Sequence, residues 1–135
     1  MPTRISQKTK EILTRKIHNR RNRYTPRATE RPTAKLVIVT GKAAGKVYRC
    51  DSSRTYLGRA RDNHVIIQEP SVSRRHACLE RKRETFLLED LNSTNGTILN
   101  RRAIGREFLH HGDKIQIGET VLQFIMEEGN QRYGV

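Results

Sequence analysis

The sequence has no tryptophan, only two cysteines, and aromatic residues at just 5% of its 135 positions. Cys50 and Cys78 lie far apart and neither belongs to a CxxC pair, so we expect neither a disulfide framework nor a zinc site. We interpret them as two small apolar residues in a reducing compartment. No apolar run is long enough to span a membrane, and the N-terminus lacks the apolar segment of a signal peptide. We therefore expect a soluble, cytoplasmic protein.

Acidic residues are also scarce, because 14 Asp or Glu stand against 27 Lys or Arg, and the formal net charge is +13. Residues 1–32 hold ten of the basic residues and only two acidic ones, a net charge of +8. This composition predicts a largely flexible basic arm over residues 1–33, with a short helix near residues 6–18. Two interpretations stay open: a solvated tail, or a contact with nucleic acid or another acidic surface.

From residue 35 onward helical periodicity is absent, and short runs typical of β-strands follow one another between turn signals. These runs cover residues 36–39, 46–51, 56–57, 65–67, 77–81, 85–88, 97–99, 114–117 and 120–126. Many short strands at regular spacing predict an all-β protein, a two-sheet β-sandwich over residues 34–128. Residues 129–135 would form a C-terminal tail.

Polar runs at 58–59, 73–76 and 92–97 lie at the ends of predicted strands and should therefore be loops. Loops held by a rigid sheet are where binding groups tend to lie. Gly58 lets the backbone bend close to a ligand, and Arg59 offers a planar fork to phosphate. The hydroxyl and the backbone N–H of Ser73 are both predicted to face an anion near the guanidinium groups of Arg74 and Arg75.

Two further features of these loops concern His76 and Asn95. His76 directly precedes an apolar strand and is predicted to fix the loop by bonding to backbone across the site. Asn95-Gly96 is a turn signal, but Thr94 and its polar neighbours exceed what a turn requires. The Asn95 amide has a donor and an acceptor, which suits the N–H and C=O groups of an extended peptide.

Catalysis and metal binding are the alternatives to a binding site. Ser73, His76 and Asp90 occur in the order of a hydrolase triad, but no G-x-S-x-G elbow surrounds the serine. His110 and His111 are neighbours whose side chains diverge on a strand or loop, so we interpret them as a solvated pair. We predict no catalytic residues, no metal site and no cofactor.

Taken together, these runs resemble the forkhead-associated (FHA) domain family over about residues 35–127. The matching segments are residues 57–59, 72–77, 91–97 and 112–113, with Ile115 and Ile117-Gly118. The resemblance implies an eleven-stranded β-sandwich whose loops at one end bind phosphothreonine in an extended peptide. One departure is Asn63-His64, which stands where an Asn-Asp pair is common in the family.

The resemblance also implies a role for each matching residue. Arg59 and Ser73 would hold the phosphate, with Arg74 and Thr94 assisting, while Asn95 would bond to the peptide backbone. Gly58, His76 and Gly96 would shape the loops. We therefore expect a non-catalytic phosphothreonine-binding adaptor downstream of a Ser/Thr kinase, with no membrane partner. The alternative is a nucleic-acid-associated protein that binds RNA or DNA through its basic arm and uses the sandwich as a docking unit.

Overall fold

The computed structural model describes residues 31–127, and most of the predicted basic arm and the tail at 129–135 lie outside these described residues. The strands, in chain order, are β1 (Thr33–Ile38), β2 (Val47–Arg49), β3 (Arg54–Gly58), β4 (Val65–Ile66), β5 (Ala77–Lys82), β6 (Thr85–Asp90), β7 (Thr97–Leu99), β8 (Arg102–Ile104), β9 (Arg106–Phe108), β10 (Lys114–Ile117) and β11 (Thr120–Glu127). No helix among residues 31–127 is long and apolar enough to cross a membrane.

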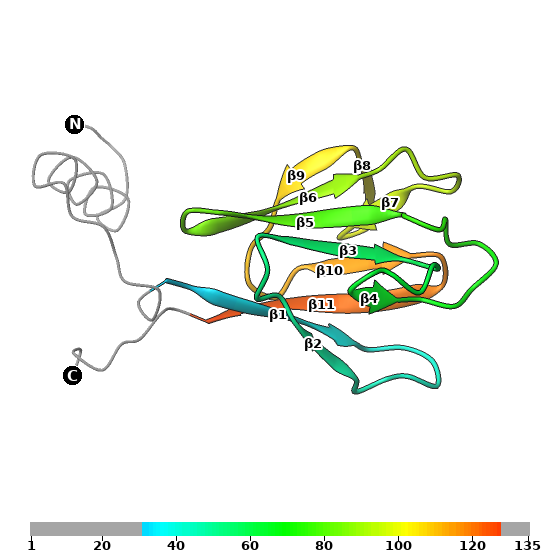
Figure 1. Cartoon of the computed structure of the whole chain (residues 1–135), viewed down its shortest axis with the longest axis horizontal. Helices are drawn as coiled ribbons and strands as arrows, with labels where there is room; N and C mark the ends of the chain where they lie inside the picture. Colours follow the sequence, from blue (N-terminus) through cyan, green and yellow to red (C-terminus); the bar gives the residue numbers. More distant parts are fainter. Residues whose placement is uncertain (1–30, 128–135) are drawn as a thin grey trace, which may run out of the picture.

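The strands form two sheets that pack face to face (Figure 1). One sheet has six strands in the order β2-β1-β11-β10-β7-β8, and the other has five in the order β4-β3-β5-β6-β9. All neighbours are antiparallel except β3 and β4. The predicted all-β sandwich is confirmed. The pairs β1–β2, β5–β6 and β10–β11 are antiparallel hairpins.

The core lies between the sheets because alternate residues of the strands point inward. In β1, for example, Leu36 and Ile38 are buried while Val37 is only half-buried. Phe86 of β6 and Phe124 of β11 join the two sheets, with ring centroids 5.4 Å apart in an edge-on arrangement. Full burial of a side chain of this size contributes roughly 1.5–3 kcal/mol to stability.

The two cysteines are buried and form no disulfide. Burial raises the pKa of the Cys50 thiol to about 11, and burial also raises the pKa of Cys78. Both thiols therefore stay protonated near neutral pH, which agrees with their interpretation as small apolar residues.

The residue pattern did not predict β8 or β9. Every residue of β9 is exposed, and β8 exposes Arg102 and Ala103. Both strands lie at the edges of their sheets, so their charged side chains face solvent and the apolar alternation that marks a strand is missing.

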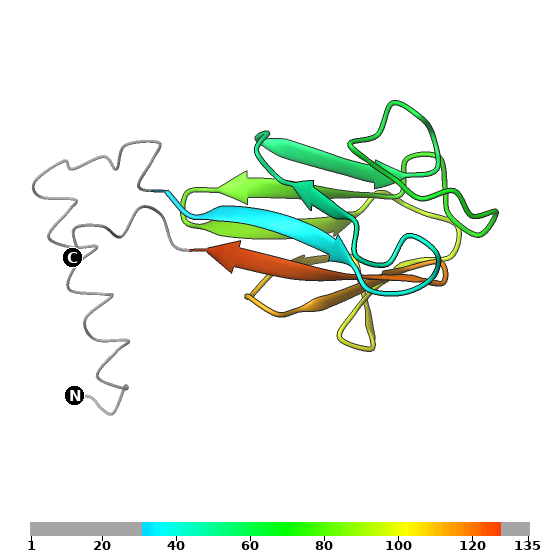
Figure 2. The ribbon, with the colours of Figure 1, turned by 90° about the horizontal axis from the view of Figure 1, so that it is seen from below.

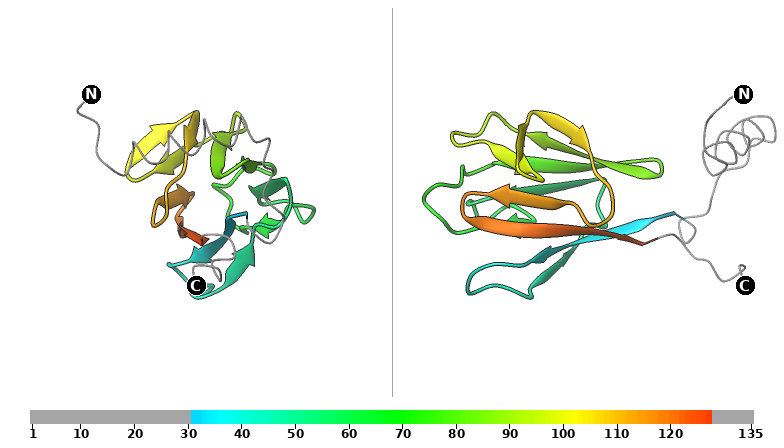
Figure 3. Two further views of the ribbon diagram at one scale, coloured as in Figure 1. Left: turned by 90° about the vertical axis from the view of Figure 1, so that its left-hand side faces the viewer. Right: turned by 180° about the vertical axis from the view of Figure 1, so that it is seen from behind.

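The loops after β3, β4 and β6 lie at one end of the sandwich (Figures 1 and 2). The start of β1 and the end of β11 lie at the opposite end, as the view from behind also shows (Figure 3). The three polar runs singled out in the sequence are thus brought to one end of the molecule by the strand topology.

Candidate functional site

Arg59 follows β3 directly, and its side chain lies along the loop between β4 and β5. Its Nε donates a hydrogen bond to the carbonyl oxygen of Val72 at 2.9 Å. Its backbone N–H donates a hydrogen bond to the carbonyl oxygen of Ser73 at 3.0 Å. The residue is exposed, and no acidic side chain among residues 31–127 forms an ion pair with it. Arg59 therefore presents a positive charge to solvent from a fixed position.

Ser73 lies next to Arg59 and connects two loops. Its Oγ accepts a hydrogen bond from the backbone N–H of Thr94 at 3.0 Å, which leaves the hydroxyl hydrogen available to an anion. Its own backbone N–H donates to Nδ1 of His76 at 3.0 Å. The prediction that this N–H faces an anion is therefore wrong, because His76 already accepts from it.

His76 is fully buried and joins the β4–β5 loop to the β6–β7 loop. Its Nε2 lies 2.8 Å from the carbonyl oxygen of Gly96. Since a carbonyl only accepts, we assign the ring hydrogen to Nε2, and Nδ1 is then the acceptor for Ser73. The structure thus places His76 behind the site, where it bonds to backbone on both sides.

Asp90 holds the base of the β6–β7 loop. Its carboxylate accepts hydrogen bonds from the N–H and the hydroxyl of Ser93, at 3.1 and 2.5 Å, and from the hydroxyl of Thr97 at 2.7 Å. Burial acts to raise the pKa of Asp90, but these hydrogen bonds outweigh it and hold the pKa below its ordinary value. The ionised carboxylate therefore orders the loop that carries Thr94 and Asn95.

Asn95 is exposed at the tip of this loop and reaches across to the β4–β5 loop. Its Nδ2 donates to the carbonyl oxygen of Ser71 at 2.8 Å. The next residue, Gly96, has a φ of +88°, a conformation that favours glycine. Asn95 and Arg59 thus bond to the carbonyls of adjacent residues, Ser71 and Val72, on either side of the site.

Gly58 and Asn63 fix the β3–β4 loop against the β4–β5 loop. A Cβ at Gly58 would lie 2.2 Å from the carbonyl oxygen of Arg74, so the close approach that requires glycine is to backbone and not to a ligand as predicted. The buried Asn63 donates through Nδ2 to the carbonyls of Ala60 and Arg74, at 2.8 and 2.7 Å. Sequence reasoning missed this role, since the charged residues before Asn63 gave no sign of its burial.

The two arginines after Ser73 have different surroundings. Arg74 is exposed, and none of the described acidic side chains pairs with it. The Arg75 guanidinium instead lies over the Tyr56 ring, 4.2 Å from its centroid, and its Nη2 is 3.4 Å from Asp62. The prediction that both guanidinium groups face one anion is therefore corrected for Arg75, which is engaged elsewhere.

Glu69 ties the start of the β4–β5 loop to the β10–β11 turn. It accepts a hydrogen bond from the backbone N–H of Glu119 at 2.8 Å and another from the hydroxyl of Thr120. Ser71 and Val72, whose carbonyl oxygens accept from Asn95 and Arg59, follow after one proline. Glu69 also accepts from the nearby Ser71 hydroxyl at 3.4 Å, but the two partners on the β10–β11 turn lie 50 and 51 positions away, so no local signal reveals this tie.

The contacts differ from those of a hydrolase triad. Ser73 Oγ bonds to Thr94 and not to His76, and the Asp90 carboxylate bonds to Ser93 and Thr97. A nucleophile activated by its histidine would need the hydroxyl within reach of a ring nitrogen that acts as acceptor.

His110 and His111 also have separate surroundings. The backbone N–H of His110 donates a hydrogen bond to the Asp113 carboxylate at 2.7 Å. The ring Nδ1 of His111 instead accepts a hydrogen bond from the backbone N–H of Met126 at 3.1 Å. Across residues 31–127 no group of three or more metal-ligating side chains comes together.

Comparison with known proteins identifies the family. The family profile described as "FHA domain" matches residues 55–118. A solved structure described as "Structural and functional analysis of phosphothreonine-dependent FHA domain interactions" superposes with a TM-score of 0.66 at 30% sequence identity, covering 70% of this chain and 97% of that chain. This chain belongs to the FHA domain family.

Two curated relatives of this FHA domain protein are named as an inhibitor and a regulator. It is 37% identical over 93 residues to the oxoglutarate dehydrogenase inhibitor of Corynebacterium jeikeium, covering 69% of this chain and 65% of that protein. It is 36% identical over 93 residues to the glycogen accumulation regulator GarA of Mycobacterium tuberculosis, covering 69% of this chain and 57% of GarA. The matched region thus spans less than two thirds of each relative's length.

Proposed function

We propose that this FHA domain binds phosphothreonine peptides through Arg59, Ser73, Arg74, Thr94 and Asn95. The protein would act as a non-catalytic adaptor downstream of a Ser/Thr kinase. The observation that carries the proposal is the pair of hydrogen bonds from Arg59 and Asn95 to adjacent carbonyls of one loop segment. Ser73 follows that segment, so a guanidinium, a hydroxyl and an amide are held side by side at an exposed rim.

The chemistry of this rim fits a phosphate group. A phosphorylated threonine carries close to two negative charges and three acceptor oxygens near neutral pH. Arg59 and Arg74 supply positive charge, and the Ser73 hydroxyl supplies a hydrogen-bond donor. Each charge-assisted hydrogen bond is worth roughly 1.5–3 kcal/mol.

Specificity for a peptide would come from the β6–β7 loop. We assign the Asn95 amide to the backbone of the ligand next to the phosphothreonine, where its donor and acceptor match an N–H and a C=O. Loop positions are set by His76, Gly58 and Gly96 without contact to the phosphate. Because these loops are already hydrogen-bonded to one another, little ordering is needed on binding.

An adaptor function agrees with the names of the relatives, an inhibitor and a regulator. Recruitment or inhibition of a bound partner requires only binding. The domain would then bind its partner after a Ser/Thr kinase has phosphorylated that partner, and would not bind the unphosphorylated form.

A calorimetric titration tests the proposal. A phosphothreonine peptide array selects one sequence, which is then titrated in three forms, with phosphothreonine, phosphoserine or threonine at the central position. We expect a preference of about 100-fold or more for phosphothreonine over threonine, which corresponds to about 3 kcal/mol. Equal affinity for these two peptides would contradict the proposal.

Two substitutions in neighbouring loops test whether the phosphopeptide binds at the site that contains Arg59. Arg59→Ala should abolish phosphopeptide binding and leave the fold intact, because the side chain is exposed. Arg75→Ala is the matched control, since that guanidinium is engaged by Tyr56 and Asp62. Its affinity should stay close to that of the unmodified protein.

A further inference from the structure

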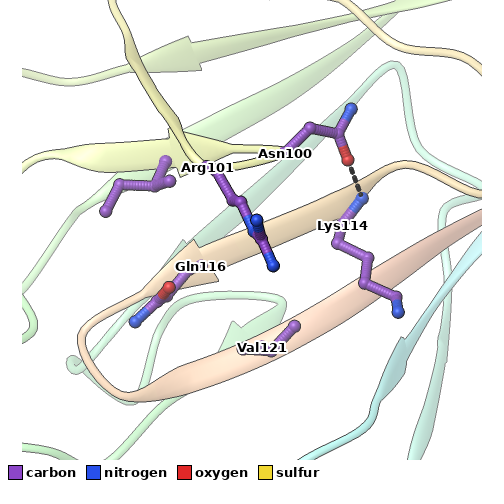
Figure 4. A pocket seen from close by; sticks show the side chains of 6 residues that line it. Asn100, Arg101, Lys114, Gln116 and Val121 are labelled. Atoms are coloured by element: carbon purple, nitrogen blue, oxygen red, sulfur yellow. Dashed lines mark hydrogen bonds between the residues drawn. The ribbon is translucent and has the colours of Figure 1, made fainter.

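The outer face of the six-stranded sheet carries a groove (Figure 4). None of the residues of the proposed phosphopeptide site lines it. It has a volume of about 390 Å³ and is formed by strands β7, β10 and β11 with the β7–β8 turn. The lining residues are Ile98, Asn100, Arg101, Lys114, Gln116 and Val121.

The turn above the groove has an unusual residue. Asn100 and Arg101 have φ values of 48° and 72°, so this two-residue connection is a type I′ turn, in which the second position favours glycine. Asn100 fixes the turn on β10, because its Oδ1 accepts from the Lys114 N–H at 2.9 Å and its Nδ2 donates to Asp113 at 3.0 Å. Arg101 occupies the position that favours glycine, and we interpret this strained choice as a sign that its guanidinium has a binding function.

The rim of the groove is positively charged. Arg101 and Lys114 are both exposed, and neither forms an ion pair with any acidic side chain in the described part of the chain. Figure 4 shows the Arg101 side chain extending over β10 between Gln116 and Lys114. The nearby Asp113 is occupied by Asn100 and by the N–H of His110.

The groove also has an apolar part. Ile98 and Val121 are half-buried on the same face. The carbonyl oxygen of Val121 accepts a hydrogen bond from the N–H of Val39, so Val39 lies beside Val121 toward the β2 edge of the sheet. Val39 is 39% exposed and Val47, on β2, is 49% exposed. Branched aliphatic side chains and two cations thus share one sheet face.

We propose that this face is a second docking surface, for an acidic segment of a partner protein with aliphatic side chains between its carboxylates. Charge complementarity selects this occupant, since carboxylates would pair with Arg101 and Lys114. The chain's own residues 1–32, with a net charge of +8, have the wrong sign. A second copy of the chain in a two-fold contact would bring the same cations together. The proposal does not depend on phosphothreonine binding.

The test is an NMR titration of the full ¹⁵N-labelled chain with a defined probe peptide, acetyl-Asp-Val-Glu-Ile-Asp-Val-Glu-amide. Amide signals of the β7–β8 turn and of β10 should shift, whereas a probe with lysine in place of each acidic residue should cause no shift. If the lysine probe binds equally, if only the amides of Arg59, Ser73 and Asn95 move, or if no signal moves at millimolar probe, the proposal fails.

Arg101→Gly separates binding from folding. Glycine suits the positive φ at this position, so thermal unfolding should occur several degrees higher, while probe affinity falls about fivefold, the loss expected for one exposed charge pair. Lys114→Gln should weaken binding similarly. Arg59→Ala should leave probe binding unchanged. Unaltered probe affinity in both groove variants, or a dimer that Arg101→Gly dissociates, would overturn the proposal.

Discussion

The buried imidazole of His76 donates a hydrogen bond to the carbonyl oxygen of Gly96 at 2.8 Å, although the two residues lie 20 positions apart. Its other ring nitrogen accepts from the N–H of Ser73 at 3.0 Å. One side chain, fully removed from solvent, therefore sets the spacing between the loop of Ser73 and the loop of Asn95. The proposed ligand contacts depend on a residue that touches no ligand.

We predict that His76→Ala will lower both stability and phosphopeptide affinity. The substitution leaves the Ser73 N–H and the Gly96 carbonyl without their partner and opens a cavity, which together should cost about 2–4 kcal/mol. Urea unfolding measures the loss. His110→Ala is the control, because that side chain is 85% exposed, and its unfolding midpoint should not move. Two variants of equal stability would show that the His76 bridge is unimportant.

Gly58→Ala is predicted to displace the β4–β5 loop. The added Cβ would lie 2.2 Å from the backbone carbonyl of Arg74, and backbone moves less easily than a flexible side chain. We expect a destabilisation of about 1–3 kcal/mol and a loss of phosphopeptide affinity. Gly105→Ala, where a Cβ meets nothing within 4 Å, supplies the comparison. The prediction is refuted if the two substitutions have the same effect on binding.

These positions show how far the sequence alone determines the site. The motifs placed Arg59, Ser73 and Asn95 in loops at strand ends, and the sheet topology brings those loops to one end of the sandwich. The residues that hold the loops were less accessible to sequence reasoning. Asn63 bonds to the Arg74 carbonyl 11 positions away, and Glu69 bonds to groups 50 and 51 positions away. These tertiary contacts are not visible in the local sequence pattern.

The strands show the same division between local and tertiary information. Strands with one buried face were predicted because their apolar residues recur at the expected spacing. β8 and β9 lack that signal, since their residues are largely exposed at sheet edges. What defines them is backbone pairing with β7 and β6, which a sequence pattern does not report.

The hydrogen-bonded Asp90 carboxylate predicts a pH dependence of stability. Its pKa is lowered in the folded protein, so the stabilisation is present above the ordinary value of 3.8 and is lost as the pH falls through the lower folded pKa. Compared with Asp90→Asn, the unmodified protein should be more stable at pH 6, and the difference should vanish well below pH 3.8. Guanidinium unfolding at a series of pH values measures this, and a difference independent of pH would contradict it.

The basic arm carries the remaining prediction, that it binds nucleic acid independently of the phosphopeptide site. Residues 1–30 contain nine Lys or Arg against two Glu, and their removal keeps the Pro32 carbonyl that accepts from Arg81 at 2.7 Å. The probe is a labelled mixed-sequence 30-nucleotide single-stranded DNA.

The full chain should bind this DNA with an affinity that falls steeply with salt, because phosphate contacts release counterions. The chain without residues 1–30 should lose that binding and keep its phosphopeptide affinity. Arg59→Ala in the full chain should show the reverse, since Arg59 belongs to the proposed phosphopeptide site on the sandwich, where it bonds to Val72, and not to the arm. If DNA binding is undiminished after the deletion, the nucleic-acid contact lies on the sandwich and the prediction for the arm is wrong.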